Sequence, residues 1–197
     1  MTDVLSDVRA GLREHFARTG IRDEPAAASV TFLGAETIEV LRFGPSVSGV
    51  YHYVSLGCSR HPMLDPTSMV IDSASGPRAE VVVTQRGATP TGLVRSIAVV
   101  ASTPAVEGLV LVPDALVDLE TPLWEGAPFT AMLLGASDID DIELPAPYDP
   151  VVVLTATPIT PTEAAWVRLK GADAMREAWR VDGVDVDDPR RRAASPT

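Results

Sequence analysis

Three apolar runs of strand length place the strongest constraint on how this chain can fold. They occupy residues 109–112, 129–134 and 151–154, and each is preceded directly by glycine or proline. Because successive side chains of a strand point to opposite faces, a run that is apolar at consecutive positions suits a strand that is covered on both faces. We therefore predict core strands in a sheet with helices packed on it.

Further β-favouring segments extend this sheet. Residues 30–33 and 37–43 are short runs that predict a hairpin, and residues 21–29 before them are typical of a linker. Residues 50–56 alternate between two sets of side chains, as a strand with differently covered faces does. Residues 78–84 contain another β-favouring run, so the sheet gains strands from both halves of the chain.

Helical signals occur at the start, middle and end of the chain. Residues 3–19 carry apolar side chains at spacings of three and four, which predicts an amphipathic helix. The Thr-Pro pair at residues 89–90 indicates a cap and a first-turn proline, so we expect a second helix that ends at Pro104. Residues 160–163 (Thr-Pro-Thr-Glu) combine a capping-box pattern with a first-turn proline, which starts a third helix. Gly171 should interrupt it and begin a second helical segment.

Together these elements predict an α+β fold, in which helices pack against a mixed, mostly antiparallel β-sheet. A chain of 197 residues fits one domain, and we assign residues 1–182 to it. Residues 183–197 have low hydrophobicity and a basic, polar end, which predicts a disordered tail. Trp166 and Trp179 lie on the apolar side of the last two helical segments, so we expect both side chains to be buried against the sheet.

The net charge of −11 originates in one part of the chain. No Lys or Arg occurs between Arg95 and Arg168, whereas this stretch holds 11 of the 27 acidic residues, leaving 16 to balance the 16 bases. The acidity opposes binding to nucleic acid. It suits either a solvated face or a surface that attracts another protein of basic character. The densest acidic run supplies the predicted partner-binding residues, which are Asp138, Asp140, Asp141 and Glu143.

Other classes of function find little support in the sequence. A single cysteine, Cys58, allows no internal disulfide, and the N-terminal residues lack a secretory pattern, which predicts a reduced, cytoplasmic protein. No apolar run reaches the roughly 18 residues of a membrane-spanning helix, so we expect no membrane partner. The spacing of the three histidines and one cysteine matches no metal site, and no glycine-rich phosphate loop is present. We therefore predict neither a metal nor a cofactor.

Residues 57–61 (Gly-Cys-Ser-Arg-His) are the densest group of reactive side chains, and they follow a predicted strand directly. A hydrolase or transferase could use Cys58 or Ser59 as nucleophile and His61 as base. Catalysis requires a base within hydrogen-bond reach and a third group that orients it, which adjacency in sequence does not provide. We predict that the chain is not an enzyme and keep this group as the alternative.

Residues 53–63 (YVSLGCSRHPM) resemble the strand-Gly-x-Ser-x-x-Pro-Met signature of the suppressor-of-fused domain family. The later segments RAEVVV, EGAPFTAMLLG and PITPTEAAWVRLKGADAMREAW follow in the order that this family shows, and the resemblance covers residues 30–182. Each motif is weak by itself, and their common order carries the likeness. The last segment looks like the closing Thr-Pro-x-Glu helix of the family.

The resemblance implies a mixed α/β domain without known catalytic residues that acts through protein contacts. Bacterial members of the family are thought to serve as immunity proteins against polymorphic toxins, many of which are basic nucleases. The function we expect is therefore a non-enzymatic protein-binding module, with neutralisation of a basic toxin as its most concrete form. The animal family member grips an added peptide strand with two domains, and this grip is not expected of a single domain.

Overall fold

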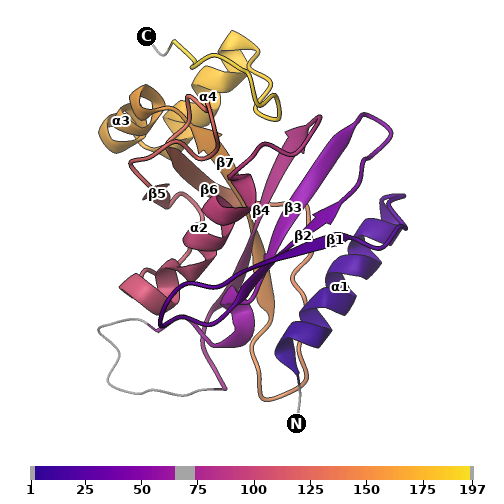
Figure 1. Ribbon diagram of the computed structural model, residues 1–197. Coiled ribbons are helices and arrows are strands. Elements are labelled where there is room, and N and C mark those ends of the chain that lie inside the picture. Colours follow the sequence, from indigo (N-terminus) through magenta and orange to yellow (C-terminus); the bar gives the residue numbers. More distant parts are fainter. Residues whose placement is uncertain (1–2, 65–73, 196–197) are drawn as a thin grey trace.

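The computed structural model describes residues 3–64 and 74–195, which form one twisted sheet with helices on both of its faces (Figure 1). Among these residues the strands are β1 (Ala26–Val30), β2 (Ile38–Phe43), β3 (Val50–Leu56), β4 (Arg78–Arg86), β5 (Leu116–Asp118), β6 (Ala131–Ala136) and β7 (Val151–Ile159). The helices are α1 (Val4–Arg18), α2 (Leu93–Glu107), α3 (Pro161–Lys170) and α4 (Ala172–Asp182), and η1 (Cys58–Arg60) is a short 3₁₀ turn.

The sheet has seven strands in the order β1-β2-β3-β4-β7-β6-β5. All neighbouring pairs are antiparallel except β4 and β7, which are parallel, with Glu80 opposite Val153. The parallel pair forms where the chain leaves β4 through α2 and returns to the middle of the sheet after β5 and β6. This arrangement confirms the predicted α+β class and its mixed, mostly antiparallel sheet.

Alternating side chains divide the core between the two faces of the sheet. Ala79, Val81 and Val83 of β4 pack with α2, whereas Val82 packs with α1. The same alternation along β7 turns its odd-numbered residues toward the face of α1. On that face α3 and α4 cover the end of β7 at Ile159 and the neighbouring part of β6. Two separate helical layers, α1 and the α3–α4 pair, therefore share one face of the sheet.

The predicted start of α3 is confirmed in detail. The Thr160 hydroxyl accepts a hydrogen bond from the Glu163 backbone N–H at 3.2 Å, while the Glu163 carboxylate accepts one from the Thr160 N–H at 2.9 Å. Of the two tryptophans, Trp179 is buried, but Trp166 is only half-buried, with Lys170 over its ring. The expected burial is thus correct for α4 and only partial for α3.

Residues 183–195 differ from the disordered tail expected from their composition. After α4 the chain passes the end of β4, where the backbone N–H of Arg86 donates a hydrogen bond to the Asp187 carbonyl at 2.9 Å. Arg191 is then buried against α3 and α4 and pairs with Glu163 at 2.8 Å. Ala194 is also buried in the cluster that α3 and α4 form, and Val184 and Val186 pack against that cluster. Composition did not indicate this order, because the contacts that hold the segment come from other elements of the fold.

Two strand predictions were wrong in position. The first strand is Ala26–Val30, which lies mostly in the segment assigned to a linker and overlaps the predicted run 30–33 only at Val30, because pairing with β2 orders a run of small residues. Residues 109–112 do not form a strand; they follow the C-cap of α2 at Gly108, and Leu109 and Val112 are exposed. The strand that follows α2 is instead β5, which begins a few residues further along the chain.

Pro104 lies inside α2 instead of ending it, and the expected cap at Thr89 is not used, since Gly92 precedes the first helical residue. A proline has no N–H for the carbonyl four residues earlier. Here the Thr103 hydroxyl donates to that carbonyl, of Val100, at 2.8 Å and so satisfies it. The helix continues to Glu107. No helix in residues 3–64 and 74–195 is both long and apolar enough to span a bilayer.

Candidate protein-binding groove

The predicted partner-binding residues lie on segment 137–145, which runs along α1. Asp138, Asp140, Asp141 and Glu143 are all exposed. The residues between them anchor the segment, because Ile139, Ile142 and Leu144 are buried, and Ile142 forms an isolated β-bridge to Val151. The alternation of apolar and acidic residues therefore turns every one of the four carboxylates outward.

Gly11 allows this segment to lie close to α1. A Cβ atom at Gly11 would be only 2.7 Å from Cγ2 of Ile142, so a larger residue would push the segment away. The hollow between them has a volume of about 500 Å³ and also contains Asp7 and Glu14 of α1. Arg18 pairs with Asp140 at 3.0 Å. The other three segment carboxylates form no ion pair with any residue that the structure describes.

A second hollow, of about 230 Å³, continues from the first, since His15 lines both. His52 of β3, Thr84 of β4 and Asp138 also line it. Burial lowers the pKa of His52, and the nearby His15 lowers it further. Burial also lowers the pKa of His15, with Arg18 acting in the same direction and Asp140 and Asp138 against it. Both imidazoles are therefore neutral at pH 7.

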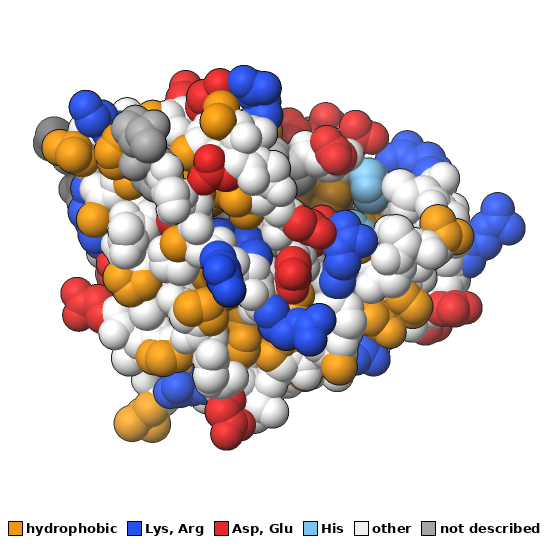
Figure 2. Space-filling view, turned by 90° about the horizontal axis from the view of Figure 1, so that it is seen from above, with side chains coloured by type: hydrophobic (Ala, Val, Ile, Leu, Met, Phe, Trp, Pro, Cys, Tyr) orange, Lys and Arg blue, Asp and Glu red, His pale blue; other side chains and the backbone are white. Residues whose placement is uncertain are grey.

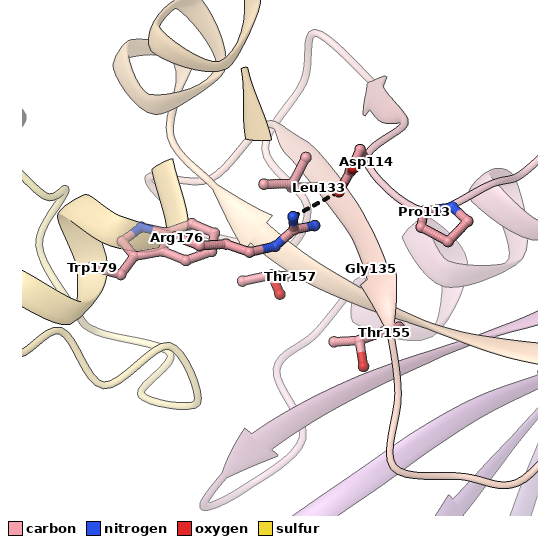
Figure 3. Close-up of a pocket in the computed structure, with 9 residues that line it drawn as sticks. Pro113, Asp114, Leu133, Gly135, Thr155, Thr157, Arg176 and Trp179 are labelled. Carbon is pink, nitrogen blue, oxygen red and sulfur yellow. Dashed lines mark ion pairs between the residues drawn. The ribbon is translucent and has the colours of Figure 1, made fainter. Parts of the chain in front are cut away.

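A third hollow, of about 370 Å³, shares Thr155 with the second and lies over the part of the sheet that neither α1 nor α4 covers. Figure 3 shows Arg176 reaching from α4 above the strand residues Thr155 and Thr157, toward Asp114. Arg176 pairs with Asp114 at 2.6 Å and donates to the Leu134 carbonyl at 3.0 Å. Two hydroxyl groups line this hollow because the odd-numbered side chains of β7 change from valine to threonine at residues 155 and 157.

The three hollows adjoin one another at His15 and Thr155, and together we call them the α1–α4 groove. Figure 2 looks down on the molecule and shows histidine side chains beside a hollow whose rim carries both acidic and basic side chains. Sequence reasoning found only the acidic segment of this groove. His52 gave the one available signal, because it interrupts the apolar face of its strand, whereas Thr155 and Arg176 come together only through sheet pairing and helix packing.

The alternative catalytic group is not assembled as a nucleophile and a base. Ser59 is buried and donates to the Glu80 carboxylate at 2.6 Å. His61 instead contacts Glu36, with Nε2 at 2.9 Å from the carboxylate. Within the described residues no hydrogen bond joins His61 to Cys58 or Ser59. The geometry therefore gives these side chains structural partners.

Cys58 is expected to react slowly with thiol reagents in the native protein. Burial raises its pKa well above the ordinary value, and the negative charge of Glu80 adds to this, so little thiolate exists at neutral pH. Labelling with a chromogenic disulfide should be slow for the folded protein and fast in urea, where the same thiol is free. Stoichiometric labelling of the native protein at the urea rate would contradict this expectation.

Solved structures with the same fold belong to suppressor of fused proteins. A homologue from Neisseria gonorrhoeae gives a TM-score of 0.66 at 17% identity, covering 98% of this chain and 97% of that one. The Sufu-Fu complex gives 0.69 at 12% identity, with 96% and 91% covered. Drosophila Suppressor of Fused gives 0.71 at 12%, covering 98% of this chain and 51% of the longer one. These similarities define an α+β domain with the suppressor of fused fold.

The sequence profile described as Suppressor of fused protein (SUFU) matches residues 34–192. The chain therefore belongs to the suppressor of fused family, as the motif around Gly57 indicated. Among curated proteins, none matches the sequence. Family membership supports the general class of protein-interaction modules for this domain.

Proposed function

We propose that this chain is an immunity-type binding protein that neutralises a basic protein toxin, and that the acidic segment of the α1–α4 groove is its contact surface. The observation that carries the proposal is the position of four outward carboxylates beside Asp7 and Glu14 of α1, three of which form no ion pair within residues 3–64 and 74–195. Charge of one sign gathered along a groove raises the association rate of a partner of opposite sign.

The fold supports a protein as the partner. One solved structure of similar fold is a Sufu-Fu complex, in which a suppressor of fused protein is bound to Fu. The hollows of the groove combine apolar side chains and threonine hydroxyls with charged groups from α1, α4 and the acidic segment. Such a surface suits an extended or helical segment of a partner better than it suits a buried small molecule.

Neutralising the acidic segment is expected to slow partner binding without unfolding the domain. The variant Asp138→Asn, Asp140→Asn, Asp141→Asn and Glu143→Gln removes four exposed charges and keeps the buried anchors. At low salt we expect an association rate about tenfold lower than wild type, and a much smaller difference near 0.15 M, where the screening length is about 8 Å. Stopped-flow or biosensor kinetics across ionic strength measure this.

The experiment needs a defined partner and a matched control. Secreted proteins encoded beside this gene are co-expressed with the chain, and growth rescue identifies the toxin whose binding is then measured. The control variant changes four exposed acids outside the segment, Asp23→Asn, Glu24→Gln, Glu177→Gln and Asp182→Asn, so its net charge matches. If both variants bind as wild type does and salt has no effect, the electrostatic contact is refuted.

A further inference from the structure

The second hollow of the α1–α4 groove has the size of a site for one side chain. Its volume of about 230 Å³ is below the roughly 300–1,000 Å³ of pockets that hold whole small molecules. His15 and Phe16 of α1 and His52 of β3 line it, and the Phe16 and His52 rings lie 5.1 Å apart between centroids. Aromatic rings from two elements therefore contribute to its wall, and guanidinium groups stack favourably on such rings.

The charges around this hollow favour a cation. Asp138 lines it and forms no ion pair with any residue in the described part of the chain, whereas Arg18 is held by Asp140. No Lys or Arg that the structure describes lines the hollow. Helix α1 also ends beside it, and the C-terminal end of a helix carries a partial negative charge. The hollow thus offers a carboxylate and a helix end to a cation that this chain does not supply.

Two neutral imidazoles add hydrogen-bond acceptors. Among the described residues His15 forms no hydrogen bond, and His52 contacts only the Thr84 hydroxyl, at 3.5 Å from Nδ1. A neutral imidazole has one ring nitrogen that accepts and one that donates. Because burial lowers the pKa of both rings, they keep this acceptor and carry no competing positive charge at neutral pH. Guanidinium and ammonium groups only donate, so they match these acceptors.

We propose that the second hollow binds one arginine side chain of the basic partner, with its guanidinium beside the two imidazoles and the Asp138 carboxylate. Arginine fits better than lysine, because its planar group stacks on rings, offers five N–H donors and is more weakly hydrated than an ammonium. Since the arginine belongs to the proposed toxin, the assignment rests on the proposed function. The acidic segment attracts the toxin from a distance, and the hollow holds it once it is bound.

Small probes test this site without the toxin. The amino-acid derivatives Nα-acetyl-arginine N-methylamide and Nα-acetyl-citrulline N-methylamide have nearly the same shape, and only the first is charged. At constant ionic strength, the arginine probe should shift the amide NMR signals of His15, His52 and Asp138 in a saturable way, with a dissociation constant of about 1–10 mM. The citrulline probe should bind at least about tenfold more weakly, and the corresponding lysine probe more weakly than the arginine probe.

Two single variants with the same loss of charge separate this hollow from the rest of the acidic segment. Asp138→Asn should weaken binding of the arginine probe at least about fivefold, because it removes the carboxylate of the hollow. Asp141→Asn is the matched control: Asp141 lines the first hollow and not the second, so binding should change less than about twofold. Both side chains are exposed, and circular dichroism should show both variants folded.

The outcomes for the arginine site and for the proposed function are distinct. A wild type that gives no saturable shift with the arginine probe overturns the site, as does equal binding of the citrulline or lysine probe. An effect of Asp141→Asn as large as that of Asp138→Asn also overturns it, even where a toxin still binds through the acidic segment. Probe binding as expected, with no toxin neutralised by the chain, supports the site and refutes the proposed function.

Discussion

Replacing Glu163 by glutamine is expected to lower the free energy of unfolding by about 3–5 kcal/mol, because it leaves the buried Arg191 guanidinium without its counter-charge. Both side chains are almost fully buried, at 0% and 4% exposed. The Glu163 carboxylate also accepts hydrogen bonds from the Trp179 indole N–H at 2.9 Å and the Ala194 N–H at 3.0 Å. One carboxylate thus joins α3, α4 and the C-terminal segment.

Urea unfolding followed by tryptophan fluorescence measures this effect. The control is Glu177→Gln, which removes an exposed carboxylate from its pair with Arg180 on the surface of α4 and should leave stability unchanged within error. The C-terminal segment should also become accessible to protease in Glu163→Gln. A variant as stable as wild type would show that the buried pair contributes nothing net to the fold.

The same carboxylate makes stability depend on pH. Burial alone would raise the pKa of Glu163, but hydrogen bonds from Arg191, the Thr160 and Ala194 N–H groups and Trp179 hold it below its ordinary value of 4.5. Its contribution is therefore complete above the unfolded-state pKa and is lost as pH falls through the lower folded-state value. The decrease in stability below about pH 4.5 should be shallower in Glu163→Gln.

Replacing Glu80 by alanine is expected to cost about 3–5 kcal/mol of stability, since it leaves several buried donors unpaired at about 1–3 kcal/mol each. The fully buried carboxylate accepts the N–H groups of Gly57 at 2.8 Å and Ser59 at 2.9 Å, and both the Ser55 and Ser59 hydroxyls. Gly57 has φ of 146°, and a Cβ there would lie 2.9 Å from Ile38, so the turn has no alternative residue.

Glu80→Gln should lose about half as much, because an amide oxygen can still accept some of these bonds. The control is Glu39→Gln, which removes a half-exposed carboxylate from its pair with Arg9 and should have a small effect. Equal stability of Glu80→Ala and wild type in urea unfolding would refute this role. The Gly-x-Ser motif of residues 57–59 is explained by this network, which attaches the end of β3 to β4.

Much of the fold was predictable because its signals are local. The capping box at Thr160 and the apolar stripe of α1 involve residues within one or two helical turns, so neighbours in sequence fix them. The strands β3, β4 and β7 were found for the same reason. The run at 109–112 failed because an apolar segment fits a strand or an irregular connection equally well until its pairing partner is known.

The candidate groove was predictable only in its acidic segment. The concentration of carboxylates is a property of composition, and the proline breaks after residue 143 place them outside regular structure. His15, Thr155 and Arg176 carry no signal that joins them, because they lie on α1, β7 and α4. They become neighbours because all three lie beside the strip of the sheet that α1 and the α3–α4 pair leave uncovered.

The sequence by itself determined the starts of α1, α3 and α4, most strands and the excess of negative charge between Arg95 and Arg168. The tertiary structure decided which of those charges remain free. Arginines from outside the stretch reach into it, as Arg18 does for Asp140 across 122 residues and Arg191 for the buried Glu163. Local hydrogen bonding acts between near neighbours and is legible in sequence, whereas pairing of distant charges depends on how the layers pack, which no local pattern specifies.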